Sequence, residues 1–236
     1  MKIRNLLLIS TLFAFILSSC GQGVSPNVKL KTELDSVSYA LGIDVANSLQ
    51  RGSVDEINYN AFLKGMEDVF DEKDIDIEDE EIKMIIQNFF KKIRDEKNQK
   101  NLLEGRKFLE DNKEKKEISV TESGLQYEVI EEGEGVSPSE TDTVVVHYRG
   151  TLIDGTEFDS SHERGEPARF ALNKVIPGWT EGLQLMKEGA NYKFYIPTEL
   201  GYGMQVRPGG PIEPNMALIF EVELIEVVKG PESAEE

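Results

Sequence analysis

One stretch of the sequence decides the fold: Val144-Val-Val-His-Tyr-Arg-Gly-Thr-Leu-Ile-Asp-Gly-Thr-Glu-Phe-Asp159. Its first half is rich in β-branched and aromatic side chains, which favour a strand. Asp154-Gly155 is a dipeptide typical of a tight hairpin turn, and a second strand is expected over residues 156–159. The stretch therefore predicts an antiparallel β-hairpin.

Further strands are expected on both sides of this hairpin. From residue 121 onward the pattern has a period of two, which is typical of strands with one buried face. One short helix fits, over residues 179–186 after Pro177-Gly178. The other strands are expected over residues 125–130, 168–172, 191–196 and 216–228. The C-terminal half is therefore predicted to be an antiparallel sheet wrapped on one short helix, an α+β domain.

The N-terminal half has the period of helices instead. Leu41, Val45 and Leu49 recur at intervals of four, and a second helix is expected from Asn58, a favourable N-cap, to Phe70. A long connecting helix is expected over residues 78–117, where there is no Pro. Within it, residues 94–101 lack apolar side chains, which is typical of a helix that bridges solvent between packed regions. An all-α domain is thus expected ahead of the sheet.

The charge also divides the chain into two parts. The sequence has 236 residues and a formal net charge of -18. Residues 20–118 contain 16 basic and 22 acidic residues, whereas residues 119–236 contain 8 and 22. This difference favours two domains. The first domain has a thin core of short helices, so we expect a homodimer formed through residues 32–93.

The N-terminus resembles a bacterial lipoprotein signal. Lys2 and Arg4 precede an apolar run over residues 6–17, which is shorter than the ~20 residues that a membrane span needs but suits a signal peptide. The run ends in Leu17-Ser-Ser-Cys20, with the only cysteine of the chain. An ordinary secretory signal with an incidental cysteine is the alternative. We expect a signal peptide over residues 1–19, lipidation of Cys20 as a membrane anchor, and a polar tether over residues 20–31.

Composition argues against several kinds of partner. The net negative charge makes nucleic acid a poor partner. A single Cys and two His exclude an internal disulfide and a Cys-based or multi-His zinc site. The acidic cluster at residues 74–81 lacks the Gly and Glu that a calcium loop needs, and its side chains are expected to favour the N-terminal end of the long helix instead. No metal and no cofactor is expected.

Four blocks of the C-terminal half resemble the FKBP-type peptidyl-prolyl cis-trans isomerase domain. They occur in the order and spacing of that family: Val145–Ser161, Val175–Gly182, Leu200–Gly203 and Leu218–Leu224. Ser123-Gly-Leu-Gln-Tyr127 and the helical first half are similar to its macrophage-infectivity-potentiator-like subfamily, here in a lipoprotein form. The resemblance implies a helical dimerisation domain over residues 32–77, an isomerase domain over residues 118–229 behind the long helix, and an acidic tail over residues 230–236.

The resemblance also implies an aromatic pocket that binds the proline ring. Trp179 would form its floor, and Asp159 would be a polar wall residue paired with Arg164 or Tyr148. Core packing is the alternative role for the aromatic residues, and a surface salt bridge is the alternative for Asp159. The implied catalytic residues are Tyr148, Phe158, Asp159, Trp179, Tyr202 and Phe220. The implied substrate-binding residues are Val175, Ile176, Ile212 and Arg164.

A function follows from this resemblance. The expected protein is a peptidyl-prolyl isomerase that assists the folding of exported proteins, with proline-containing unfolded or exported polypeptides as partners. Macrolide ligands of the family are candidate partners too, although Ala168 replaces a bulky aromatic of the human cytosolic member. The alternative is a chaperone-like holder of unfolded chains in the cleft of a dimer; a surface adhesin rests on subfamily association alone. The expected location is the bacterial cell envelope, lipid-anchored at the periplasmic face of the outer membrane.

Overall fold

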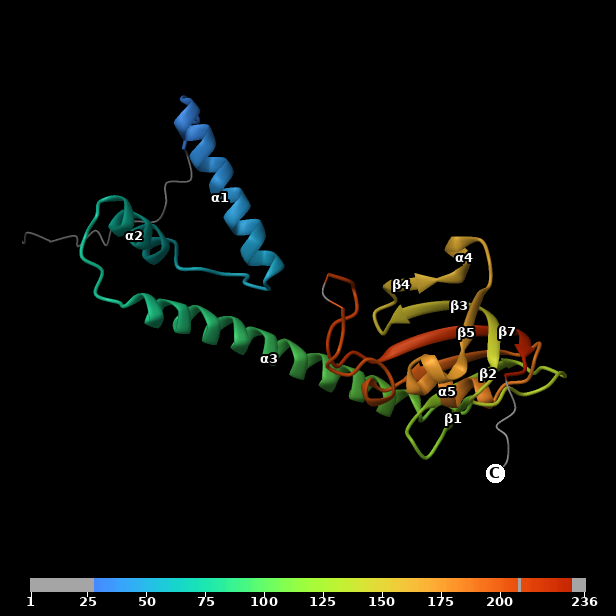
Figure 1. The fold of residues 1–236 in the computed structure, drawn as a ribbon. Coiled ribbons are helices and arrows are strands. Elements are labelled where there is room, and N and C mark those ends of the chain that lie inside the picture. Colours follow the sequence, from blue (N-terminus) through green and yellow to red (C-terminus); the bar gives the residue numbers. More distant parts are fainter. Residues whose placement is uncertain (1–27, 208, 231–236) are drawn as a thin grey trace, which may run out of the picture. The chain divides into compact units, whose positions relative to one another are not determined.

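The computed structural model of the chain describes residues 28–207 and 209–230. The predicted signal peptide, the lipidation site Cys20, most of the tether and nearly all of the acidic tail lie outside these described residues. The chain divides into two units between Asn88 and Phe89. Figure 1 shows the elements that each unit contains.

The first unit contains helices α1 (Glu33–Arg51) and α2 (Tyr59–Phe70) and the start of α3 (Asp79–Asn112). Thr32 begins α1 with a capping box, in which its hydroxyl accepts from Asp35 N at 3.1 Å and the Asp35 carboxylate accepts from Thr32 N at 2.9 Å. Asn58 caps α2 as predicted, because its side-chain oxygen accepts from Ala61 N at 3.0 Å. Local polar contacts therefore set where both helices begin.

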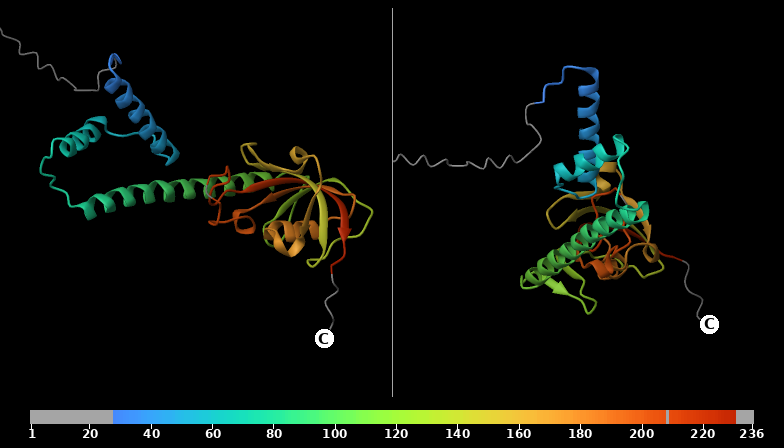
Figure 2. Two further views of the ribbon diagram at one scale, coloured as in Figure 1. Left: turned by 45° about the horizontal axis from the view of Figure 1, so that its top comes forward. Right: turned by 90° about the vertical axis from the view of Figure 1, so that its left-hand side faces the viewer.

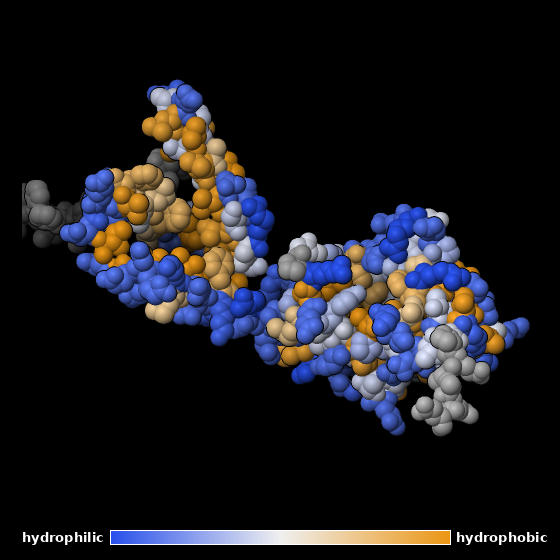
Figure 3. All heavy atoms as spheres, in the orientation of Figure 1, coloured by the Kyte–Doolittle hydropathy of each residue, from blue (hydrophilic) through white to orange (hydrophobic). Residues whose placement is uncertain are grey.

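The large apolar side chains of α1 and α2 remain open to solvent, whereas Val54 in the connection between them is buried. No residue of α1 or α2 is buried, and Leu41 is 61% exposed. A groove of about 280 Å³ lies between these helices, and Val45, Leu49 and Phe62 are among its lining residues. Figure 3 shows hydrophobic side chains gathered on the two helices. The described residues of this unit thus leave an apolar surface uncovered.

The second unit is built around a seven-stranded antiparallel sheet. Strand β3 (Thr143–Leu152) pairs with the last strand, β7 (Leu218–Val228), along its whole length. The pairing runs from Thr143 opposite Val228 to Leu152 opposite Leu218. The strand order is β1-β2-β6-β7-β3-β4, and β5 also pairs with β3. The strands are β1 (Ile118–Val120), β2 (Gln126–Glu131), β3 (Thr143–Leu152), β4 (Glu157–Ser160), β5 (Ala168–Ala171), β6 (Asn191–Ile196) and β7 (Leu218–Val228).

Helix α5 (Pro177–Gln184) packs against this sheet, as Figure 2 shows. Gly182 permits a close approach to β6, because a Cβ at this position would lie 2.7 Å from the ring of Phe194. Leu183 and Phe194 are fully buried in the core that forms between helix and sheet. The α+β class is therefore confirmed. The shorter segments are α4 (Ser161–Arg164), η1 (Leu172–Lys174) and η2 (Thr198–Leu200).

The long helix α3 ends at Asn112, whereas the sequence predicted a helix to residue 117. The chain turns there because the buried Asn112 side chain donates a hydrogen bond of 2.9 Å to Gln126 Oε1 in β2. The prediction that residues 94–101 are solvated all round is wrong for one face of the helix: Asn98 and Asn101 are buried, although residues 94–96, 99 and 100 are exposed. Their hydrogen-bond partners, the Asn215 side-chain amide and the Pro214 carbonyl, belong to the loop that precedes β7, so this face of α3 packs into the second unit. Within the described ranges, no helix has both the length and the apolar composition to cross a bilayer.

Candidate active site

A pocket of about 740 Å³ lies in the second unit, where β3, β4 and β7 face α5 and the loop before β7. The structure adds to its lining four residues that the sequence analysis missed: Phe170, Lys174, Pro177 and Arg207. It brings together in this lining nine of the predicted residues: Tyr148, Phe158, Asp159, Val175, Ile176, Trp179, Tyr202, Ile212 and Phe220. The tenth, Arg164, lies outside the lining but contacts two of its members.

Trp179 is the centre of the aromatic part of this pocket. It is 4% exposed and is held by α5, whose N-terminal residue Pro177 fixes the entry of the chain into the helix. Its ring lies 5.2 Å from Tyr148, 5.3 Å from Phe170 and 5.2 Å from Phe220, with interplanar angles between 80° and 88°. Edge-to-face packing of this kind is the geometry that aromatic quadrupoles favour. The rings therefore hold one another in a fixed apolar wall.

Gly150 makes room for two of these rings. It lies in β3, and a Cβ built on it would be 2.5 Å from the Phe158 ring and 2.9 Å from the Phe220 ring. Phe158 and Phe220 themselves meet edge to face at 5.3 Å and 82°. Any side chain at position 150 would displace them. The glycine in the hairpin stretch is thus a requirement of the pocket wall.

A polar triad completes the wall beside these rings. The Tyr148 hydroxyl donates to Asp159 Oδ2 at 2.5 Å, and Arg164 donates to Asp159 Oδ1 at 2.5 Å and to the Tyr148 hydroxyl at 2.7 Å. The sequence left Arg164 and Tyr148 as alternative partners of Asp159, and the structure gives it both. All three side chains are therefore locked in one arrangement.

The triad also sets the charge of its members. Burial and the bond to Asp159 raise the pKa of Tyr148 to about 12, so the phenol stays protonated and stays a donor. Burial raises the pKa of Asp159, but the hydrogen bonds from Tyr148 and Arg164 outweigh this effect and leave that pKa below its ordinary value. The hydrogen bonds of Arg164 to the Tyr148 hydroxyl and to Asp159 raise the pKa of its guanidinium. At neutral pH the pocket wall thus carries an ionised carboxylate whose charge is matched by one guanidinium.

Several donors at the pocket have no protein partner among the described residues, and the buried Nε1–H of Trp179 is one of them. The backbone N–H of Ile176 and the hydroxyl of Tyr202 form no hydrogen bond within the part of the chain that the structure describes. Tyr202 is 42% exposed, and burial of its hydroxyl end raises its pKa, so it too stays protonated. Both groups are therefore available as donors to an acceptor that enters the pocket.

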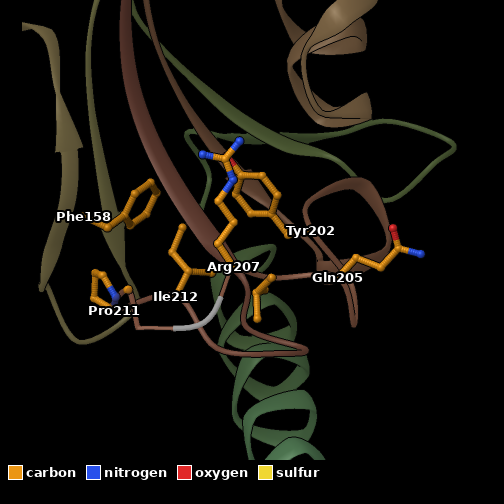
Figure 4. Close-up of a pocket in the computed structure, with 8 residues that line it drawn as sticks. Phe158, Tyr202, Gln205, Arg207, Pro211 and Ile212 are labelled. Atoms are coloured by element: carbon orange, nitrogen blue, oxygen red, sulfur yellow. The ribbon is translucent and has the colours of Figure 1, made fainter.

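A second hollow of about 410 Å³ adjoins the pocket under the loop before β7. The two share Phe158, Tyr202, Arg207 and Ile212. Figure 4 shows this loop hollow, with the Arg207 side chain extended toward Tyr202. The loop therefore contributes both an apolar and a charged side chain to the entrance.

Helix α3 anchors the C-terminal end of this loop. The side-chain amide of Asn101 donates to the carbonyl of Pro214 at 3.1 Å, and that of Asn215 donates to the carbonyl of Asn98 at 3.2 Å. Lys97 forms an ion pair of 2.6 Å with Glu213. These contacts hold the residues that follow Ile212 directly, and so they limit how far Ile212 can move.

The additional lining residues differ in whether the sequence pattern could have predicted them. Phe170 is two residues from Ala168 on β5, and both are half-buried on the inner face while Arg169 is exposed. The period of two therefore could have identified Phe170 as a wall residue. Ala168 packs against the core and is not part of the pocket lining. Lys174 and Arg207 lie at the end of η1 and in a loop, where no periodicity marks their direction.

The arrangement offers no set of metal ligands. Among the described residues there is no group of three or more His, Cys, Asp or Glu side chains that could hold a metal ion. What the pocket offers instead is an aromatic wall, a locked polar triad and unpartnered donors. Such a site can bind, orient and desolvate a ligand without forming a bond to it.

Comparisons with known proteins identify the family of the chain. A family model described as FKBP-type peptidyl-prolyl cis-trans isomerase matches residues 134–225, and a model of the domain amino terminal to it matches residues 34–129. The chain is 39% identical over 218 residues to Outer membrane protein MIP of Legionella longbeachae, covering 89% of this chain and 93% of the relative. It is 41% identical over 218 residues to the FKBP-type peptidyl-prolyl cis-trans isomerase FkpA of Aeromonas hydrophila, covering 87% and 80%.

A solved structure is similar over almost the same length. The crystal structure of FkpA from Escherichia coli superposes with a TM-score of 0.69 at 38% sequence identity, covering 86% of this chain and 100% of that chain. Relatives of this identity match both the helical first part and the pocket-bearing second part. The chain therefore belongs to the FKBP-type peptidyl-prolyl cis-trans isomerase family, in the group whose curated members carry the names Mip and FkpA.

Proposed function

We propose that this isomerase assists the folding of exported proteins by binding the twisted form of an X–Pro amide in the pocket around Trp179. The observation that carries the proposal is the meeting of buried aromatic rings with unpartnered donors, the Ile176 N–H and the Tyr202 hydroxyl among them, in one cavity. Its partners are proline-containing unfolded or exported polypeptides.

The reaction needs a particular kind of binding and no bond chemistry. Rotation about the X–Pro bond has a barrier of about 18–20 kcal/mol, which comes from amide resonance. The cis and trans forms differ by only about 0.5–1 kcal/mol. A catalyst therefore has to bind the non-planar amide more tightly than either planar form, and it needs no nucleophile or proton relay.

The aromatic residues provide that preference. A twisted amide has lost its resonance and carries less charge separation, so an apolar cavity that removes water from the carbonyl favours it. Trp179 supports the proline ring from below, and Phe158 and Phe220 enclose it at the sides. Tyr148 and Asp159, locked by Arg164, keep the polar edge of this cavity in place.

The donors keep the chain in register. We assign the Ile176 N–H and the Tyr202 hydroxyl to the carbonyls of substrate residues beside the proline. Val175 and Ile212 pack on the substrate from the η1 side and from the loop. Holding the flanking chain while the prolyl bond turns restricts the motion to the one dihedral that must change.

A fluorogenic X–Pro peptide assay tests this site. Wild type accelerates isomerisation, and Tyr202→Phe lowers kcat/KM by roughly two- to tenfold, the usual value of one hydrogen bond. Asp159→Leu removes the centre of the triad and lowers it further. Tyr195→Phe is the matched control, because it deletes a hydroxyl that bonds Glu128 outside the pocket. Full activity of both pocket variants would show that the site is assigned wrongly.

We also propose that the protein is anchored in the bacterial envelope by lipid on Cys20, at the periplasmic face of the outer membrane. Support comes from the run that ends in Leu17-Ser-Ser-Cys20 and from a relative named Outer membrane protein MIP. Cys20→Ala should move the protein from the membrane fraction to the soluble fraction and abolish labelling by radioactive palmitate. A variant that stays in the membrane fraction would contradict the anchor.

A second copy is the proposed cover for the apolar surface of α1 and α2. In this assignment residues 32–77 form the dimerisation domain, the dimer contact extends to residue 93, and residues 118–229 form the isomerase domain behind the long helix. The exposed Leu41 and the groove lined by Val45 and Phe62 support it. Unpartnered apolar faces of this extent are typical of protein–protein interfaces.

Chaperone-like holding of unfolded chains is the second candidate function. Tyr202, which lines the pocket and is 42% exposed, and Met204, two residues further along the chain and 60% exposed, offer apolar surface to which an unfolded chain could bind without being isomerised. The two functions separate in the full-length Asp159→Leu variant. Undiminished suppression of aggregation by a variant that is inactive on peptides favours holding, whereas a parallel loss of both activities favours catalysis.

A further inference from the structure

The charges around the pocket indicate which substrates it prefers. Residues 119–236 contain eight basic and 22 acidic residues, a net charge of -14. Five of the basic side chains form ion pairs with carboxylates: Arg149, Arg164, Arg169, Lys193 and Lys229. Among the described residues, the other three, Lys174, Lys187 and Arg207, have no ion-pair partner within 4.0 Å.

Two of these three uncompensated cations line the pocket. Lys174 and Arg207 both belong to its lining, and both side chains are exposed. Asp159 is the acidic residue of the same lining, and its charge is already matched by Arg164 at 2.5 Å. The entrance of the pocket therefore has an excess of positive charge within a strongly negative unit.

The two cations approach the entrance from different elements. Lys174 ends η1 directly before Val175 and Ile176, whereas Arg207 lies in the loop and extends toward Tyr202 (Figure 4). The positive charge of Arg207 acts on the Tyr202 hydroxyl, where it partly offsets the rise in pKa that burial and Asp159 cause. A chain that leaves the proline site toward η1 or toward the loop thus meets a cation close by.

We propose that Lys174 and Arg207 make this pocket select X–Pro segments that carry Asp or Glu within about two residues of the proline. The inference rests on the proposed site. The negative charge of the whole unit opposes it at long range, but salt screens charges beyond about 8 Å at physiological ionic strength. A carboxylate in contact with Arg207 or Lys174 lies within that distance. Its attraction to these two cations is therefore stronger than the screened repulsion from the rest of the unit.

The test compares peptides that differ in one residue next to proline, with Glu, Gln or Lys there. For wild type in about 0.15 M salt, kcat/KM for the Glu peptide should exceed that for the isosteric Gln peptide by roughly two- to fivefold, the range of an exposed ion pair. The Lys peptide should fall below both. The ratio of kcat/KM for the Glu peptide to kcat/KM for the Gln peptide should approach one in about 1 M salt, where the screening length falls to about 3 Å.

Charge-removing variants assign the effect to residues. The double variant Lys174→Gln with Arg207→Gln should bring the Glu to Gln ratio to one or below. Lys187→Gln is the matched control, since it removes the third cation, which does not line the pocket, and it should keep the wild-type ratio.

Three outcomes overturn the inference: a wild-type ratio of one, a ratio that survives in the double variant, or a ratio that Lys187→Gln abolishes as well. In each of these cases acceleration of the Gln peptide would still support the isomerase site. A wild type that accelerates none of the peptides would refute the proposed site together with the preference.

Discussion

Asn101 of α3 donates a hydrogen bond of 3.1 Å to the backbone carbonyl of Pro214, two residues beyond the pocket residue Ile212. A buried side chain of the long helix is thus in direct contact with the loop that borders the active site. The connecting helix is therefore part of the catalytic unit, and its sequence should influence turnover.

Asn101→Ala should raise KM more than it lowers kcat. The loop would lose one anchor, so Ile212 would pack less firmly on bound substrate while the aromatic wall stays intact. We expect a fall in kcat/KM of about two- to fivefold and a loss of stability near 1 kcal/mol, the value of one hydrogen bond. Steady-state kinetics on a fluorogenic peptide and urea unfolding measure both. Gln99→Ala, at an exposed position of the same helix, should change neither.

Gly150→Ala should disrupt the pocket wall without straining the backbone. The new Cβ would lie 2.5 Å from the Phe158 ring and 2.9 Å from the Phe220 ring, so one of the two rings has to move. Overpacking of this kind costs about 1–3 kcal/mol, and kcat/KM should fall with it. Thermal unfolding and the peptide assay measure these losses.

The same substitution at Gly65 serves as the comparison for Gly150→Ala. Nothing lies within 4 Å of a Cβ there, and Gly65 is inside α2 and does not line the groove. Alanine should raise helix stability at this position by about 0.5–1 kcal/mol. If Gly150→Ala were equally harmless, the close packing described for Phe158 would be incorrect.

Asp142→Asn should remove stability that depends on pH. The Asp142 carboxylate accepts from Ser139 N at 2.7 Å, Gly230 N at 2.9 Å and Lys229 Nζ at 2.9 Å. Burial alone would raise its pKa, but these bonds outweigh burial and hold the pKa well below its ordinary value. The carboxylate therefore stabilises the folded state fully above about pH 4, and this contribution is lost as the pH falls further.

Urea unfolding at several pH values checks this prediction. At pH 7, Asp142→Asn should lower the free energy of unfolding by about 1.5–3 kcal/mol, the value of a hydrogen bond to a charged group. The difference from wild type should shrink below pH 4, because the carboxyl of the unfolded wild-type chain then takes up a proton that the folded state does not bind. A difference that stays constant from pH 7 to pH 3 would argue against a role for the charge.

The strands and helices could be predicted where the signal is local. The β3–β4 hairpin followed from Asp154-Gly155, and the start of α2 followed from Asn58, because turn and cap residues act on their immediate neighbours. Strand β1 could not be predicted, since its three residues have no period and are ordered by pairing with β2. The prediction that the aromatic residues line one pocket came from the family resemblance and not from any pattern in the sequence.

Polar residues were the hardest to place from the sequence. Asn98 and Asn101 were interpreted as solvated, because a polar helix segment is normally exposed unless a distant partner satisfies it. Their partners, Asn215 and Pro214, are more than a hundred residues away along the chain. Arg207 and Lys174 posed the same problem, since the direction of a charged side chain outside regular structure depends on tertiary contacts.

Val45→Glu should separate the proposed dimer. Val45 lines the groove between α1 and α2 and is 38% exposed in a single chain, so a monomer would tolerate a glutamate there at little cost. In a dimer the carboxylate would be buried without a partner, which costs several kcal/mol. Light scattering on residues 21–236 should report a dimer for wild type and a monomer for the variant.

Asn47→Glu provides the control for Val45→Glu. Asn47 lies on the same helix, is exposed and does not line the groove, so the same new charge there should leave the mass unchanged. A wild type that is already monomeric would remove the second copy from the proposal, and the isomerase site would stand.

The packing of α3 has a practical consequence for anyone who wants to work with the catalytic part alone. Leu109 is buried with Tyr195 and Ala217, and Phe108 and Ile219 pack against them on the outer side of the sheet. A fragment that begins at residue 119 would lack α3 and would expose this hydrophobic cluster to solvent, so it would tend to aggregate. Crystallisation or inhibitor screening on a shortened protein should therefore start at or before Phe89, so that the fragment carries its own share of the helix.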